Sequence, residues 1–135
     1  MNDRFINEVT CGDSEQLIQE LDDNSIDLLV TSPPYNVDLG YNAKHKNPYD
    51  LYQDNKSHSD YVAWLERIFG NVKAKMVTGG RVCINIGDGR NGSVPTHSDI
   101  IQFMTRDLGY IMMATIIWNK NTTAGWDYTA INENA

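Results

Sequence analysis

The chain has 135 residues, of which 41% are hydrophobic, and its 18 acidic residues outnumber 11 lysines and arginines to give a net charge of −7. This length supports one domain with a hydrophobic core and is small for two, so we expect a single domain over residues 1–135. No apolar stretch approaches the roughly 20 residues that span a membrane, and the N-terminus does not resemble a signal peptide, so a cytoplasmic protein without membrane contact is expected.

The first predicted elements alternate between strands and helices. Residues 7–11 are predicted to form a short strand, and residues 12–14 a turn that can cap a helix over residues 15–21. Residues 26–31 form a continuous apolar run, which is typical of a buried strand in a parallel sheet. A long polar loop follows, and structureless loops of this length are often functional or mobile.

The alternation continues to the end of the chain. Ser57 or Ser59 is predicted to cap a helix that ends near Met76. It is followed by a strand over residues 81–86, a helix over 96–108 and a strand over 110–118. This order predicts an α/β fold with a mostly parallel sheet of about four strands, flanked by helices and joined by right-handed crossovers.

The cysteines and histidines show no metal-binding pattern. Cys11 and Cys83 belong to no C-x-x-C pair, so we expect neither a zinc site nor a disulfide framework, but two reduced, buried thiols in or beside strands. His45, His58 and His97 share no ligand spacing. The sequence therefore predicts no bound metal.

The most informative segment follows the apolar run that ends at Thr31. Ser32, Pro33, Pro34 and Tyr35 come directly after it, at the carboxyl end of the strand, where open parallel sheets bind their ligands. They offer hydroxyl and carbonyl oxygens for N–H groups, two prolines that stiffen the turn, and a ring that can stack. This combination suits a planar, amino-bearing group. The alternative is a purely structural turn.

Thr-Ser-Pro-Pro-Tyr, residues 31–35, closely resembles the catalytic motif of the DNA amino-methyltransferases, which use S-adenosylmethionine to methylate an exocyclic nitrogen of cytosine or adenine. The resemblance implies a partial Rossmann-like fold with DNA and S-adenosylmethionine as partners. Ser32 is more similar to the N4-cytosine branch than to the N6-adenine branch, where an Asp stands. The resemblance also implies that the Ser32 hydroxyl and the Pro33 carbonyl accept hydrogen bonds from the two amino N–H groups, while Tyr35 stacks on an extruded base.

The same resemblance gives roles to residues at other strand ends. Asp13 would lie beside the adenosine half of S-adenosylmethionine and accept hydrogen bonds from it, and Ser14 and Thr31 would also belong to the cofactor site. Asp13 or Ser14 could equally cap the helix that follows. Asn85 stands where relatives carry an acid or an amide near the target base. Because an amide cannot accept a proton as a carboxylate does, a general-base role for Asn85 is not expected.

A glycine pattern over residues 87–92 offers another interpretation. It matches G-x-G-x-x-G after a predicted strand, as in dinucleotide-binding proteins. That fingerprint needs the helix to open on the glycines, so that its N-terminus meets a pyrophosphate, but Ser93, Val94 and Pro95 intervene. In the family that the chain resembles, this stretch corresponds to the strand and loop beside the catalytic motif.

The resemblance covers the chain from about Thr10 to Lys120 but only about half of the family's fold. In the permuted (beta) class of the family the catalytic half precedes the cofactor-binding half. Nothing after Trp118 matches a glycine-rich cofactor loop or a target-recognition segment. We therefore expect the N-terminal catalytic half of a truncated or split enzyme, which a C-terminal complementing chain or a homo-oligomer could complete.

The negative charge keeps other functions open. A protein that grips DNA alone should carry a basic stripe, but this chain has only short basic patches, at residues 44–46 and at Lys73 and Lys75. The alternatives are an adenine-N6 methyltransferase, a methyltransferase acting on RNA or a protein amide, and an inactive methyltransferase-like module for binding or assembly.

Overall fold

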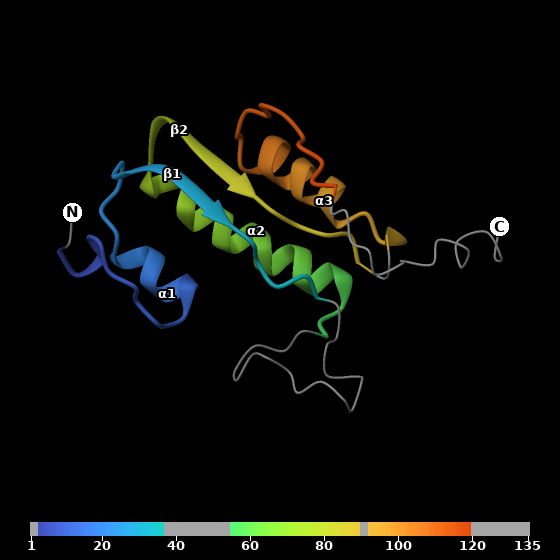
Figure 1. Ribbon diagram of the computed structural model, residues 1–135, viewed down its shortest axis with the longest axis horizontal. Helices are drawn as coiled ribbons and strands as arrows, with labels where there is room; N and C mark the ends of the chain where they lie inside the picture. Colours follow the sequence, from blue (N-terminus) through green and yellow to red (C-terminus); the bar gives the residue numbers. More distant parts are fainter. Residues whose placement is uncertain (1–2, 37–54, 90–91, 120–135) are drawn as a thin grey trace.

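The computed structural model describes residues 3–36, 55–89 and 92–119 (Figure 1). Its elements are, in chain order, the 3₁₀ helix η1 (Asp3–Phe5), α1 (Ser14–Leu17), the 3₁₀ helix η2 (Ile18–Glu20), β1 (Ile26–Thr31), α2 (His58–Lys75), β2 (Met76–Ile84), α3 (Thr96–Gln102) and the π-helical segment η4 (Phe103–Asp107). The predicted α/β class and parallel sheet are confirmed. Within the described residues the sheet has two strands, not about four.

The two strands lie side by side and point the same way. A bulge between Ile26 and Leu28 shifts the register, which is then unbroken up to the pair Thr31–Ile84. The additional residues lie on β2, where Gly79 has a φ of 84°, a backbone conformation that glycine adopts without a steric cost. Both strands therefore end at the same edge of the sheet, where their carboxyl ends meet.

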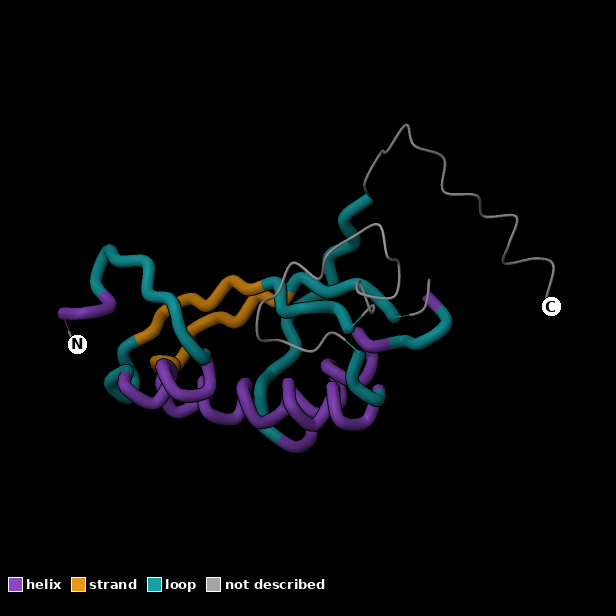
Figure 2. The backbone as a smooth tube through the Cα atoms, turned by 90° about the horizontal axis from the view of Figure 1, so that it is seen from below, coloured by secondary structure: helices purple, strands orange, loops and turns teal. Residues whose placement is uncertain are grey.

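The helices that pack on the sheet lie on one side of it, and α2 runs along both strands (Figures 1 and 2). Ser57 begins α2, because its Oγ accepts a hydrogen bond from the backbone N–H of Asp60 at 3.1 Å. The buried stripe of α2 meets α3 and η4 in the hydrophobic core, which consists of Tyr61, Leu65, Phe69, Ile100, Phe103 and Met104. Burial of these large side chains supplies most of the stabilisation.

The opposite face of the sheet is open. Leu28 and Val30 are 57% and 69% exposed, and Cys83 beside Val30 is exposed too. The prediction of two buried thiols is therefore wrong, since Cys11 is also exposed. The physical reason is that, among the described residues, the helices cover only the other face.

Two predicted strands, over residues 7–11 and 110–118, do not form. Val9 is 100% exposed and Ile116 is 90% exposed. A strand needs a neighbour for its backbone N–H and C=O groups. Neither segment is paired with the sheet, which in the described part of the chain consists of β1 and β2.

The other boundaries differ from the predicted ones by short segments. β2 begins directly after α2, five residues before the predicted strand at Arg81. The predicted helix over 96–108 changes into the π-helical η4, where the N–H of Leu108 donates to the Phe103 carbonyl at 2.8 Å. Gly109, with a φ of 68°, then ends it. None of the helices in the described ranges has the length and apolar character needed to cross a membrane.

Tyr110 carries a testable signature of this packing. Its hydroxyl donates to the Phe69 carbonyl at 3.2 Å, and burial raises the pKa of Tyr110 to about 12. We expect an absorbance titration to include a phenol that ionises near this pH, well above the ordinary value of about 10. Because the pKa is raised in the folded state, folding stability should fall as pH rises between these two values. The amplitude of the high-pH phase should fall by one phenol in Tyr110→Phe; an unchanged amplitude there would contradict the assignment.

Candidate active site

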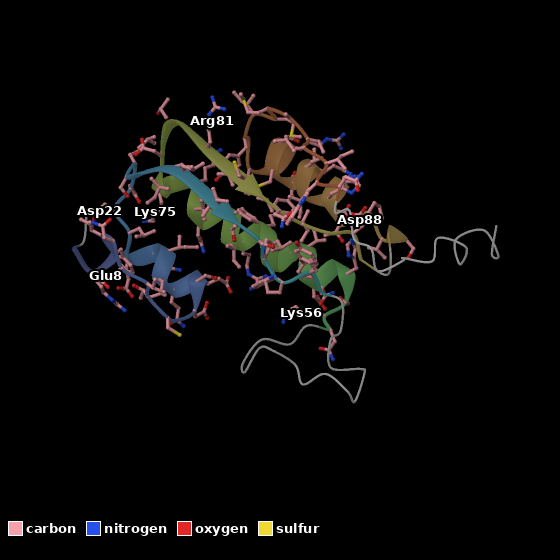
Figure 3. The ribbon with its side chains drawn as sticks, in the orientation of Figure 1. Glu8, Asp22, Lys56, Lys75, Arg81 and Asp88 are labelled. Carbon is pink, nitrogen blue, oxygen red and sulfur yellow. The ribbon has the colours of Figure 1, made fainter. Side chains whose placement is uncertain are left out.

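The segments that leave β1 and β2 meet at the carboxyl edge of the sheet. The backbone N–H of Asn85 donates to the Thr31 carbonyl at 2.9 Å, which carries the parallel pairing one residue past the strands. Lys56 and Asp88 mark this end of the molecule in Figure 3, and Lys75 marks the other end. The side chains that follow the two strands are therefore delivered to one place.

Three predicted site residues form a hydrogen-bonded cluster there. The Ser32 Oγ and the Tyr35 hydroxyl oxygen lie 3.2 Å apart. The Asn85 Nδ2 donates to the Tyr35 hydroxyl oxygen at 3.1 Å and to the Ser32 Oγ at 3.5 Å. The two hydroxyl oxygens have four lone pairs between them, and the two bonds from Asn85 and the bond between Ser32 and Tyr35 use three, so one acceptor position is left for a further N–H group. It lies on the Ser32 Oγ when Ser32 donates to Tyr35. Ser32 and Asn85 are exposed, and a ligand can reach the cluster from solvent.

The segment that carries Ser32 and Tyr35 is held in place by hydrogen bonds at two points. The hydroxyl of Tyr61 in α2 donates to the Pro34 carbonyl at 2.5 Å. The side chain of Asn36 donates to the Lys56 carbonyl at 2.8 Å and accepts from the Lys56 N–H at 2.9 Å. Sequence reasoning missed both anchors. Tyr61 could have been found, because it lies four residues before Leu65 on the same stripe and a buried phenol needs a partner.

Gly87 lets the ring of Tyr35 lie against the backbone that leaves β2. A Cβ at position 87 would lie 3.2 Å from two carbons of the Tyr35 ring, closer than ordinary contacts allow. In the same glycine-rich segment, Gly89 and Val94 form an isolated antiparallel bridge, and α3 begins only at Thr96. Among the described residues, the next α-helix begins at Thr96 and not on these glycines, so the dinucleotide interpretation lacks the helix end that would bind a pyrophosphate.

An apolar cavity of about 500 Å³ lies beside the turn, between η2, β1 and α2. It is large enough for a small organic ligand. Two of the predicted cofactor residues line it, Ser14 and Thr31, and so do Ser32, Pro33 and Pro34. Asp13 is exposed, and its Oδ1 accepts from the Glu15 N–H at 2.9 Å, so its observed contact is the capping of α1.

Both lysines of the predicted basic patch, Lys73 and Lys75, make contacts within the protein. The Lys75 Nζ lies 2.7 Å from the Asp23 Oδ1, and the Lys73 ammonium donates to the Leu108 carbonyl. Both interactions hold the C-terminal end of α2, at the end of the molecule opposite the cluster (Figure 3). The other predicted patch, at residues 44–46, lies outside the described residues.

Asp88 stabilises the start of α3 and gives a pH-dependent prediction. Its Oδ1 accepts from the His97 N–H at 3.1 Å and lies 2.7 Å from the His97 Nδ1. Burial acts to raise the pKa of Asp88, but the hydrogen bonds and charge of His97 outweigh it and hold the pKa below its ordinary value. The stabilisation is therefore present above the ordinary carboxyl pKa of about 4 and is lost as pH falls through the lower, folded-state pKa.

We expect Asp88→Asn to melt at a lower temperature than the unsubstituted chain at pH 7. The difference should shrink as pH falls below roughly 4, where Asp88 itself takes up a proton. Thermal melts followed by circular dichroism across this range measure it. A difference that is constant with pH would show that the charge of Asp88 is not involved.

The chain is similar in sequence to known methyltransferases. A family profile described as DNA methylase, of the N6/N4 methyltransferase type, matches residues 26–134. The chain is 33% identical over 117 residues to the type II methyltransferase M.MjaVI of Methanocaldococcus jannaschii, an alignment that covers 85% of this chain and 56% of that relative. It is 28% identical over 117 residues to the type II methyltransferase M.BglII of Bacillus subtilis, covering 85% and 29%. A third relative, M.MjaI of M. jannaschii, is 30% identical over 140 residues, covering 81% and 43%. The chain thus spans about half the length of these relatives, or less.

Proposed function

The chain belongs to the DNA methylase family of the N6/N4 type, and we propose that the full-length protein transfers a methyl group from S-adenosylmethionine to an exocyclic amino group in DNA. The observation that carries this proposal is the cluster of Ser32, Tyr35 and Asn85 at the carboxyl edge of the sheet. The proposed acceptor is cytosine N4, because a serine opens the motif. Adenine N6 is the alternative.

The proposed reaction depends on oxygens that face one amino group. A base inside a duplex hides its amino group, so the nucleotide must first be extruded, at a cost of a few kcal/mol. Stacking on the Tyr35 ring recovers roughly 1–3 kcal/mol. The Ser32 Oγ and the Pro33 carbonyl then accept the two amino N–H bonds. This pulls the nitrogen toward tetrahedral geometry and localises the lone pair that attacks the methyl carbon.

Asn85 acts on this geometry without acting as a base. Its amide donates to the hydroxyl oxygens of both Tyr35 and Ser32, and with Ser32 donating to Tyr35 this leaves one lone pair of the Ser32 Oγ to accept from a ligand. The nitrogen loses one proton when its new bond to carbon forms. Because Ser32 is exposed, this proton can leave to bulk water at the open edge.

S-adenosylmethionine would supply the electrophilic methyl group when bound, and the electron pair of its broken methyl–sulfur bond would remain on the sulfur of the thioether that leaves. The cavity beside the turn has room for part of it, and Ser14 and Thr31, which are among the residues that line the cavity, carry hydroxyls that could bond its polar atoms. We propose that the other half of the relatives' length corresponds to a segment that completes the cofactor site and provides the basic surface for DNA. In this proposal, the net charge of −7 is the property of a catalytic half that does not grip DNA by itself.

A direct assay separates this function from an inactive binding module. The full-length protein is incubated with DNA and S-adenosylmethionine carrying a tritiated methyl group, and calorimetry measures donor binding. We expect tritium in the DNA and micromolar binding of the donor. Donor binding without transfer to DNA would favour an RNA or protein acceptor, and neither binding nor transfer would favour the inactive module.

A further inference from the structure

Tyr61 connects the hydrophobic core to the candidate site. It is 0% exposed, in the first turn of α2, and belongs to the core cluster with Leu65 and Phe69. Its ring is therefore held by packing, and its hydroxyl donates to the Pro34 carbonyl at 2.5 Å. A phenol placed this firmly fixes the direction of the carbonyl that it binds.

The orientation of the Pro34 carbonyl depends on a backbone angle that the proline rings do not fix. Both Pro33 and Pro34 have their φ angle locked by the ring, so the path of the turn depends on the rotation of the peptide planes. The ψ angle of Pro34 sets the direction of its carbonyl and also the direction in which the chain enters Tyr35. A carbonyl held toward Tyr61 therefore determines where the Tyr35 ring and hydroxyl lie.

Both ends of this link are present in the structure. With the Pro34 carbonyl held by α2, the Tyr35 ring lies against Gly87, and its hydroxyl lies within hydrogen-bond distance of Ser32 and Asn85. Within the described residues, the hydroxyl of Tyr61 is the donor to the Pro34 carbonyl. Loss of this hydroxyl would remove the hydrogen bond that orients the carbonyl.

We propose that Tyr61 is a positioning residue for the methyl transfer: through the Pro34 carbonyl it holds the Ser32–Tyr35 turn in its reactive geometry. This inference rests on the proposed function. Tyr61 touches no reacting atom, so it acts on the rate through orientation. A displacement of about 1 Å at a reacting group can lower a rate by roughly a hundredfold.

The test is Tyr61→Phe in the full-length protein, which deletes one hydroxyl and keeps the buried ring. Tyr110→Phe is the matched control, because the Tyr110 hydroxyl also donates to a backbone carbonyl, that of Phe69, but away from the turn. We expect Tyr61→Phe to lower kcat by at least about tenfold, with KM for DNA and for the donor changed less than about twofold. Tyr110→Phe should keep the kcat of the unsubstituted protein.

A second readout works without any activity. The Tyr35 amide belongs to the same peptide plane as the Pro34 carbonyl, so its NMR resonance should shift in Tyr61→Phe and stay in place in Tyr110→Phe. An unchanged kcat, or an unshifted Tyr35 resonance in the folded variant, would overturn the positioning role. If the unsubstituted protein transfers no methyl group, the proposed function fails, and the Tyr35 resonance alone decides whether Tyr61 sets the turn.

Tyr61→Phe could also fail to fold, and the unsubstituted protein then provides the test. A hydroxyl proton of Tyr61 that is bound to the Pro34 carbonyl exchanges slowly with water. A Tyr61 hydroxyl resonance that is protected from exchange supports the inference. Rapid exchange of this proton in the folded protein would overturn it.

Discussion

Ser32→Ala is expected to lower the rate of methyl transfer by the full-length protein by roughly a hundredfold, the size found when one transition-state hydrogen bond is removed from an active site. The Ser32 Oγ is the exposed oxygen of the cluster and one of two proposed acceptors for the amino group. Without it, one N–H bond of the base has no protein acceptor. Single-turnover kinetics with saturating DNA and donor would measure the loss.

The control for this substitution is a serine at the other end of the same strand. Ser25 precedes β1, and its Oγ donates to the Asp22 carbonyl at 2.7 Å, so Ser25→Ala also deletes a bonded hydroxyl. It should leave the transfer rate unchanged. The affinity for S-adenosylmethionine should change less than about threefold in Ser32→Ala, because the hydroxyl is assigned to the acceptor base. Equal losses of donor binding and transfer would argue against that assignment.

Phe69→Ala is expected to have the largest effect on stability. Phe69 is 2% exposed in the middle of α2, and its ring lies 6.3 Å from that of Phe103 in a stacked arrangement. Deleting such a ring leaves a cavity and costs about 3–5 kcal/mol. A domain of this size has a total stability of about 5–15 kcal/mol, so the variant should lose a large fraction of it. Urea unfolding followed by circular dichroism would measure the change.

Val9→Ala is the matched control for the core substitution. Val9 lies in the segment predicted as a strand, but in the structure it is 100% exposed. Removing its methyl groups should change the free energy of unfolding by less than about 0.5 kcal/mol. A cost of several kcal/mol would mean that residues 7–11 are buried in the folded protein, as the sequence predicted.

The features that the sequence predicted correctly are local ones. The run over residues 26–31 becomes β1, because a continuous apolar segment bounded by turn residues favours a strand whatever its partner. The predicted helix that ends near Met76 becomes α2, and Ser57, one of the two predicted caps, begins it. Ser32, Tyr35 and Asn85 come together because the carboxyl ends of parallel strands share an edge.

The features that the sequence could not predict depend on distant partners. Strand pairing is non-local, because a strand forms only where a partner strand is available. The apolar residues at 7–11 and 110–118 favour strands, but their sequence does not reveal that the sheet of β1 and β2 leaves both segments unpaired. The role of the Tyr35 hydroxyl was missed for the same reason. Sequence reasoning assigned Tyr35 a stacking ring only, whereas its hydroxyl is the hub that joins Ser32 and Asn85 across the sheet edge.

The central claim is that the cluster at this edge acts on an exocyclic amino group. It is tested most directly by mass analysis of the nucleosides digested from DNA that the full-length protein has methylated. We expect N4-methylcytosine, and roughly a hundredfold less of it in the same reaction time when Ser32→Ala replaces the unsubstituted protein. Methyl groups found only on ring carbons, as in C5-methylcytosine, or an equal yield from both proteins, would contradict it.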